Sequence, residues 1–296
     1  MRTIPAKTIL ARTKDASWFG ATYNMNLYRG CCHGCIYCDS RSDCYGVEEF
    51  GTVRAKENAL ALLRDELAHK ARTGVVSMGS MSDPYNPFER DEQLTRHALE
   101  LLSAYGFGVM IATKSDLAAR DADVLREIAH QQPAIVALTI TTCDDALAAK
   151  LEPHAPPPSA RLEALRRLAK AGVFTGVLLM PVLPFLEDSA ENISAVVSAA
   201  GRAGARFVYP MLGLTMRAGQ REYFYARLDE AFPGLSGRYR SRYGTRYVCY
   251  APRTRELGAA FQQSCAEFGL LGRMPEIVAA SRQGYDRQLT LFDAPM

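Results

Sequence analysis

Three cysteines in a short, glycine-bearing segment are the residues of this sequence best suited to chemistry. Cys31, Cys35 and Cys38 lie in the stretch YRGCCHGCIYC with C-x3-C-x2-C spacing. Gly30 and Gly34 allow the backbone to fold closely around whatever is bound. Thiolates this close together are ligands for a soft metal ion or an iron–sulfur cluster. The spacing therefore predicts a metal centre held within one tight turn.

Zinc and iron–sulfur are both consistent with the cysteines taken alone. A structural zinc site needs four nitrogen or sulfur ligands, usually as two separated pairs. No second pair follows at the usual distance, although Cys32, His33 or Cys44 could supply a fourth ligand. An iron–sulfur cluster on only three thiolates keeps one iron without a protein ligand, and that iron can bind a substrate or cofactor.

The composition excludes a disulfide framework. The chain of 296 residues begins MRTIPAKTIL, without an apolar signal core, and its 48% apolar residues can form a large core without covalent staples. The remaining cysteines, Cys143, Cys249 and Cys265, are scattered. With no apolar stretch long enough to cross a membrane, the sequence predicts a reduced, cytoplasmic protein. A net charge of +3 is too small to indicate a partner.

Short apolar runs alternate with amphipathic segments along most of the chain. Buried strands are predicted at 21–28, 74–79, 107–113, 134–141, 172–180 and 205–212. Helices are predicted at 56–73, 94–105, 121–130, 159–171 and 189–203. This pattern indicates an α/β fold, a partial (β/α)6 TIM-type barrel with a C-terminal helical extension. A doubly wound open sheet would show the same alternation.

In a βα barrel the chemistry takes place at the C-terminal ends of the strands. The cysteine segment follows the first predicted strand, and polar or glycine residues follow the next three. In chain order these residues are Gly79, Ser80, Ser82, Asp83, Thr113, Lys114, Ser115, Thr139 and Thr141. They are expected to converge on the rim that carries the cysteines.

The chain resembles the radical S-adenosylmethionine (SAM) superfamily, and specifically its spore photoproduct lyase-like branch of DNA repair photolyase-like proteins. The resemblance covers roughly residues 24–209 and includes the aromatic Tyr37 before the third cysteine. Its five ordered motifs are YRGCCHGCIYC, SDPYNPFE (82–89), TKSDLAARDADVL (113–125), TITTCDDALAAKLEPHAPPPSARL (139–162) and PVLPFLED (181–188). These motifs are specific for the superfamily and say much less about the substrate.

The resemblance implies a [4Fe–4S] cluster on Cys31, Cys35 and Cys38, with SAM chelated to the open iron. One-electron reduction, by a donor such as flavodoxin or ferredoxin, then releases methionine and a 5′-deoxyadenosyl radical. The second strand end would receive the methionyl ammonium, Lys114 would bind the carboxylate, and Tyr37 would lie beside the adenine. The residues expected to bind SAM are Tyr37, Gly79, Ser80, Ser82, Asp83, Lys114, Ser115, Thr139 and Thr141. The alternatives are ordinary turn capping at 82–84 and a solvated Lys114.

Two positions depart from the spore enzyme of this branch. That enzyme has a tyrosine just after the third cluster cysteine, where this chain has Asp39. It also has a hydrogen-donating cysteine after the second strand, where residues 79–83 contain none. Repair of spore photoproduct by that route is therefore not expected. Cys143 is the candidate hydrogen-atom donor, and the alternative is an inert small residue in a packed turn.

The region 216–280 is predicted to be helical and is rich in arginine and tyrosine. Residues 217–255 contain nine arginines and six tyrosines. Arginine binds phosphate and tyrosine stacks on bases, and an enzyme that modifies a base must take it out of the stack. The candidate nucleic-acid residues are Arg238, Tyr239, Arg240, Arg242, Tyr243 and Arg246. The alternative is a helix that closes the barrel with its tyrosines packed on the core.

The last residues, 281–296, are predicted to be a flexible tail. Within QLTLF, residues Gln288, Leu289, Leu291 and Phe292 resemble the peptide by which bacterial proteins dock on the sliding clamp of DNA polymerase. The alternative is a tail that packs back on the barrel.

Four regions result: an N-terminal segment (1–20), the barrel (21–215), the helical region (216–280) and the tail (281–296). The predicted function is that of a radical SAM enzyme acting on nucleic acid, by repair of a DNA lesion or by base modification. One alternative is a radical SAM enzyme that modifies a peptide or small metabolite. Another is a non-catalytic zinc-binding barrel protein.

Overall fold

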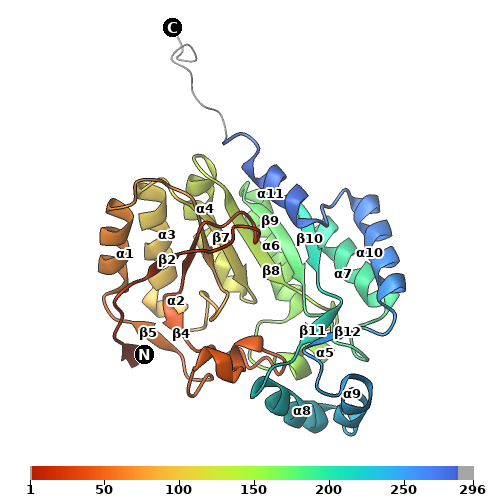
Figure 1. Ribbon diagram of the computed structural model, residues 1–296. Coiled ribbons are helices and arrows are strands. Elements are labelled where there is room, and N and C mark those ends of the chain that lie inside the picture. The colour runs from red at the N-terminus through yellow and green to blue at the C-terminus, as the bar shows by residue number, and fades with distance from the viewer. Residues whose placement is uncertain (1, 286–296) are drawn as a thin grey trace.

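A seven-stranded sheet forms the centre of the computed structural model, which describes residues 2–285 (Figure 1). The strand order is β10-β9-β8-β7-β6-β3-β2, and all neighbours are parallel except β2 and β3. The strands are β2 (Leu10–Arg12), β3 (Tyr23–Met25), β6 (Val75–Met78), β7 (Gly108–Thr113), β8 (Ala134–Thr139), β9 (Phe174–Leu179) and β10 (Phe207–Pro210). Six parallel strands in chain order confirm the partial (β/α)6 barrel.

Helices follow the strands; the longer ones cover one face of the sheet, whereas α2 and α5 lie in the connections that follow β6 and β8 (Figure 1). The helices are α1 (Ala59–Ala68), α2 (Glu89–Glu92), α3 (Leu94–Ala104), α4 (Ala122–Ala129), α5 (Asp145–Leu151), α6 (Pro158–Lys170) and α7 (Ala190–Arg202). Short 3-10 turns occur at η1 (Asp39–Arg41), η2 (Asp43–Tyr45) and η3 (Asp116–Asp121). Side-chain caps fix two starts: Asp144 accepts hydrogen bonds from the first turn of α5, and Ser189 does so for α7.

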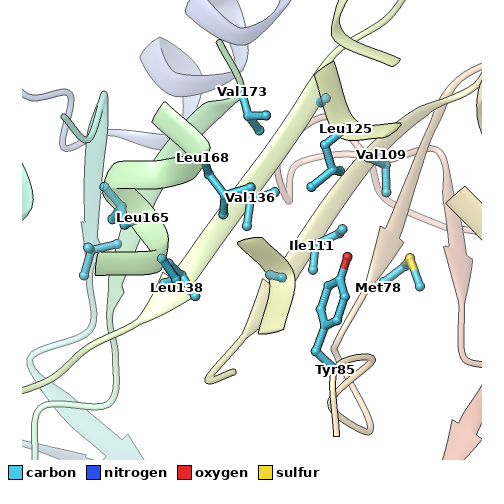
Figure 2. Close-up of a cluster of buried hydrophobic side chains, with 14 of the residues drawn as sticks. Met78, Tyr85, Val109, Ile111, Leu125, Val136, Leu138, Leu165, Leu168 and Val173 are labelled. Carbon is cyan, nitrogen blue, oxygen red and sulfur yellow. The ribbon is translucent and has the colours of Figure 1, made fainter. Parts of the chain in front are cut away.

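Both faces of the barrel strands are buried, which explains their continuous apolar runs. Figure 2 shows Val136 and Leu138 of β8 beside Leu168 and Leu165 of α6. Ala137 lies between these two β8 residues in sequence and points to the opposite face, where it belongs to a second buried cluster. The alternation gives the barrel a packed interior and a packed helical coat.

The first predicted strand, 21–28, is two strands in the structure. β3 stays in the central sheet beside β6, whereas β4 (Tyr28–Arg29) pairs with β5 (Arg54–Lys56). A small sheet results from β4, β5 and β1 (Arg2–Ile4). Leu27, at the break, accepts a backbone hydrogen bond from Lys56 rather than from the central sheet. The pairing of β4 with β5 joins segments 25 residues apart, so the apolar pattern of residues 21–28 alone could not predict the break.

The C-terminal region packs against both ends of the barrel. Helices α8 (Gln220–Ala231) and α9 (Leu235–Tyr243) lie at the end that carries the cysteine segment, below the strands in Figure 1, with the hairpin-like pair β11 (Gly213–Thr215) and β12 (Val248–Tyr250). α10 (Thr254–Phe268) packs against α7, and α11 (Met274–Arg282) covers the opposite end.

Two further predictions concern a membrane span and the C-terminal tail. No helix within residues 2–285 is long and apolar enough to span a bilayer. The proposed clamp-binding residues Gln288, Leu289, Leu291 and Phe292 lie outside the described residues.

Candidate active site

The structure brings the three cysteines to the C-terminal ends of the barrel strands. Cys31, Cys35 and Cys38 line a cavity of about 100 Å³, here called the inner cavity. Its strand-end residues are Gly79, Ser80, Met81, Ser82, Asp83, Ala112, Thr113, Lys114 and Thr139. Most residues predicted to bind a cofactor therefore share one space with the thiols.

Two glycines allow the cysteine segment to turn this tightly. Gly30 has φ +81°, and a β-carbon there would lie 2.3 Å from the carbonyl oxygen of Thr52. Gly34 has φ +74°, and its β-carbon would lie 2.9 Å from the ring of His154. Larger residues would be strained and would collide, as the sequence predicted for these glycines.

Asp83 joins two strand ends to the cysteine segment. Its buried carboxylate accepts hydrogen bonds from the Thr113 hydroxyl (2.6 Å), the Tyr85 amide (2.8 Å) and the Lys114 amide (2.8 Å). His33 Nε2 lies 3.1 Å from Oδ2. Burial raises the pKa of Asp83, but the charge of His33 and these hydrogen bonds outweigh burial and lower it to about 2. The carboxylate is thus charged and largely occupied by protein donors.

Lys114 belongs to a buried charge network that sequence reasoning missed. Its Nζ lies 4.0 Å from Glu152 Oε1 and 5.4 Å from the centroid of the Tyr37 ring. The Tyr37 hydroxyl donates to Glu152, and Arg161 pairs with the other carboxylate oxygen and donates to the Thr139 carbonyl at 2.9 Å. Burial opposes charge on Glu152, but Arg161 and Lys114 outweigh it and lower the pKa of Glu152. The solvated alternative for Lys114 is wrong, since only 18% of its side chain is exposed.

Of the two residues that were not predicted, Arg161 and Glu152, only Arg161 could have been recognised from the sequence. Arg161 lies on the buried face of α6, three residues before Ala164 and four before Leu165. An arginine at an apolar position of an amphipathic helix indicates a buried ionic partner. Glu152, the partner, lies in the turn after α5 and carries no such periodic signal.

Four of the residues predicted to bind SAM or to donate a hydrogen atom do not line the inner cavity: Tyr37, whose hydroxyl is bonded to Glu152, and Ser115, Thr141 and Cys143. Ser115 accepts a hydrogen bond from the Leu117 amide and so caps η3. Thr141 donates to the buried Glu187 at 2.6 Å, and burial raises the pKa of Glu187 to about 8 against this hydrogen bond. Cys143 is exposed, so the geometry gives no support to its role as hydrogen-atom donor.

The prediction that Tyr239 and Tyr243 stack on bases is wrong. Both are buried and pack with Phe224 and Phe185 in the cluster beneath α9. Residues four apart on a helix share a face, and here that face is turned to the core. The four predicted arginines Arg238, Arg240, Arg242 and Arg246 are exposed.

Gly79 offers a stability test of the cavity rim. A β-carbon at Gly79 (φ +96°) would lie 1.9 Å from the Ala112 carbonyl oxygen, whereas at Gly106 (φ +68°) the nearest atom is 3.9 Å away. We expect Gly106→Ala to cost about 1 kcal/mol through backbone strain alone. Gly79→Ala should cost about 3 kcal/mol or more, because backbone atoms must also move apart. Denaturant unfolding followed by circular dichroism measures both, and equal costs would contradict the close approach.

The comparison with known proteins assigns the family. Residues 25–195 match the Radical SAM superfamily. The chain belongs to the radical SAM superfamily. It is therefore a radical SAM enzyme, and the cofactors of this superfamily are a [4Fe–4S] cluster and SAM. The alternative of a non-catalytic zinc-binding barrel is overturned by this match.

Two relatives of this radical SAM enzyme show how far the similarity extends along the chain. The uncharacterised protein Rv2578c of Mycobacterium tuberculosis (strain ATCC 25618 / H37Rv) is 34% identical over 244 residues, which are 80% of this chain and 72% of the relative. The uncharacterised protein MJ0683 of Methanocaldococcus jannaschii is 35% identical over 172 residues, 57% of this chain and 63% of the relative.

Solved structures share the fold. Spore photoproduct lyase complexed with dinucleoside spore photoproduct has a TM-score of 0.64 at 17% identity, covering 88% of this chain and 76% of the lyase. The radical SAM methyltransferase TsrM from Kitasatospora setae, with tryptophan and a SAM analogue, has a TM-score of 0.54 at 12% identity, covering 88% and 58%. At these identities the likeness establishes the fold.

Proposed function

We propose that this radical SAM enzyme holds its [4Fe–4S] cluster through Cys31, Cys35 and Cys38 and acts on a nucleic acid. The convergence of the three thiols on the inner cavity, beside Lys114, carries the cluster assignment. When bound, the cluster and SAM together supply a 5′-deoxyadenosyl radical by one-electron reduction of SAM.

The arrangement of the thiols fits a cluster better than a single ion. Within residues 2–285, no group of three or more His, Cys, Asp or Glu side chains could hold one metal ion. A four-iron cluster takes each thiolate on a different iron, so its cysteines stand around a space rather than a point. Cys31, Cys35 and Cys38 line the inner cavity in this way.

The residues around the thiols have separate tasks in binding SAM. Lys114 presents a cation for the carboxylate of SAM, and Glu152 keeps that cation and the Tyr37 ring in place. Asp83, with most of its acceptor positions occupied, positions the ends of β6 and β7 rather than binding the ammonium alone. The oxygens of Ser80 and Ser82, which also line the cavity, are the remaining acceptors for that ammonium group.

Exposed arginines beside the open end of the barrel support the nucleic-acid proposal. The Arg238 guanidinium lies 4.2 Å from the ring centroid of Phe185, in the segment that follows β9. Arg240 lies 4.5 Å from the ring centroid of Tyr225. With Tyr239 and Tyr243 buried, Tyr247 and Tyr250, 48% and 60% exposed, are the aromatic side chains available for stacking.

Salt dependence tests the arginine surface. We expect binding of a single-stranded DNA oligonucleotide to weaken steeply with salt, because arginine–phosphate contacts release counterions. Replacing Arg238, Arg240, Arg242 and Arg246 with glutamine should reduce the slope of log K against log salt by about 3. Fluorescence anisotropy at several salt concentrations measures the slope.

A matched control keeps the total charge change equal. Arg72, Arg126, Arg167 and Lys170 are exposed and lie before β6 or near the ends of α4 and α6, at the opposite end of the barrel. Their glutamine replacements should leave the slope unchanged. Equal slopes for the wild type and both variants would show that Arg238, Arg240, Arg242 and Arg246 do not contact phosphate. A peptide or small metabolite would then be the better substrate class.

A further inference from the structure

A second cavity lies on the other side of the cysteine segment from the strand ends. This outer cavity has a volume of about 520 Å³ and is lined by Cys31, Cys32 and Gly34 on one side and by residues of α8 on another. None of its lining residues belongs to the central sheet, whereas strand-end residues form much of the inner cavity. The cysteine segment is therefore the wall between the two cavities.

The lining of the outer cavity is positively charged. Arg41, Lys150 and Arg227 contribute cations, and His154 lies among them. Glu230 is the one acidic residue in the lining, and it is paired with Arg227 at 2.7 Å. The excess of positive charge favours an anionic partner.

Aromatic rings hold Arg41, which forms no ion pair with any residue of 2–285. Its guanidinium lies 4.2 Å from the ring centroid of Tyr223 and 4.9 Å from that of Phe50. The buried Nε has no hydrogen-bond partner in the described chain. Aromatic faces fix a guanidinium while leaving its donors free for a carboxylate or phosphate from outside.

We propose that the outer cavity is the docking site of an acidic electron-transfer protein that carries a flavin or an iron–sulfur centre. The inference rests on the proposed cluster at Cys31, Cys35 and Cys38. A substrate would have to reach the inner cavity, because the residues proposed to bind SAM lie there. The outer cavity contacts the same cysteine segment on the side away from the strand ends, so a protein bound there would not occupy the inner cavity.

The redox step that this docking serves is a transfer of one electron. The reduced donor is oxidised by one electron, and the cluster is reduced by one; no bond forms or breaks. Carboxylates of the donor would meet Arg41, Lys150 and Arg227, which sets the orientation of its redox centre toward Cys31. A nucleic acid would satisfy the charge equally, but the outer cavity is lined by the cysteine segment and α8 and not by the strand ends at which a base would react.

The test measures binding of a flavodoxin to the anaerobically reconstituted, full-length protein. A triple variant with Arg41, Lys150 and Arg227 replaced by glutamine should bind flavodoxin about tenfold more weakly at about 50 mM salt, and the difference should shrink at about 500 mM salt. The control variant, with Arg72, Arg126 and Lys170 replaced by glutamine, loses the same charge at the opposite end of the barrel and should bind like wild type.

A chemical reductant distinguishes a loss of flavodoxin docking from a defect in the cluster itself. Dithionite needs no docking site, so it should reduce the cluster of wild type and triple variant at equal rates, while flavodoxin reduces the variant more slowly. Unchanged flavodoxin affinity in a cluster-loaded triple variant would overturn the docking proposal. Lost oligonucleotide binding with intact flavodoxin binding would overturn it in favour of a nucleic-acid site. Absence of any cluster in the wild type would instead overturn the proposed function.

Discussion

Replacing Cys31, Cys35 or Cys38 singly with alanine is expected to abolish iron binding almost completely. Each replacement removes the protein ligand of one iron, and two thiolates are not expected to retain the cluster. Anaerobic reconstitution with iron and sulfide, followed by iron and sulfide analysis and visible absorption, measures the loss. Circular dichroism of the same samples checks that the barrel is still folded.

The neighbouring cysteines supply the control for this experiment. Cys32 lines the outer cavity and not the inner one, and Cys44 is exposed with its Sγ 3.4 Å from an Arg217 nitrogen. Alanine at either position should leave the iron content near that of wild type. A cluster that survives Cys31→Ala but is lost in Cys32→Ala would show that the ligand register is shifted by one residue.

Lys114→Ala is expected to weaken SAM binding by about tenfold to 150-fold, the loss of a charge-assisted contact worth about 1.5–3 kcal/mol. The side chain is largely buried beside the thiols, and within the described chain the lining of the inner cavity contains no other lysine or arginine that could replace its charge. Calorimetric titration of the cluster-loaded protein with SAM, under anaerobic conditions, gives the affinity.

Lys150→Ala is the matched control, because this lysine lines the outer cavity. Its SAM affinity should equal that of wild type. Glu152→Gln should behave differently from both: it leaves Arg161 buried without its counter-charge and should cost about 3–5 kcal/mol of folding free energy. If Lys114→Ala binds SAM with wild-type affinity, Lys114 does not bind SAM and serves only as a structural partner of Glu152.

The parts of the fold that follow from local pattern could be predicted. Runs such as 134–141 are apolar on both faces because β8 is covered on both sides, and the helix at 158–170 follows from the spacing of its apolar residues. The strand ends then place Asp83 and Lys114 on the cysteine side of the barrel, where the inner cavity lies.

The parts that depend on distant partners could not be predicted. Glu152 meets Tyr37 across 115 positions of sequence, and no local pattern connects them. The break after β3 depends on pairing of β4 with β5. The burial of Tyr239 and Tyr243 is a different case, because their spacing of four residues on a helix was a readable sign of one packed face.

One short turn links events on the two sides of the cysteine segment. The turn at 151–154 holds the segment through two backbone hydrogen bonds, from the Ile36 amide to Leu151 (2.9 Å) and from the His154 amide to His33 (3.0 Å). Glu152 in this turn faces the Lys114 network, and His154 lines the outer cavity. Because the two side chains lie two residues apart on one hydrogen-bonded turn, we expect a displacement of His154 to move Glu152 as well. Residues 151–154 therefore connect the wall of the outer cavity to Lys114, and substitutions in them are expected to affect both the proposed docking of a redox partner and the proposed binding of SAM.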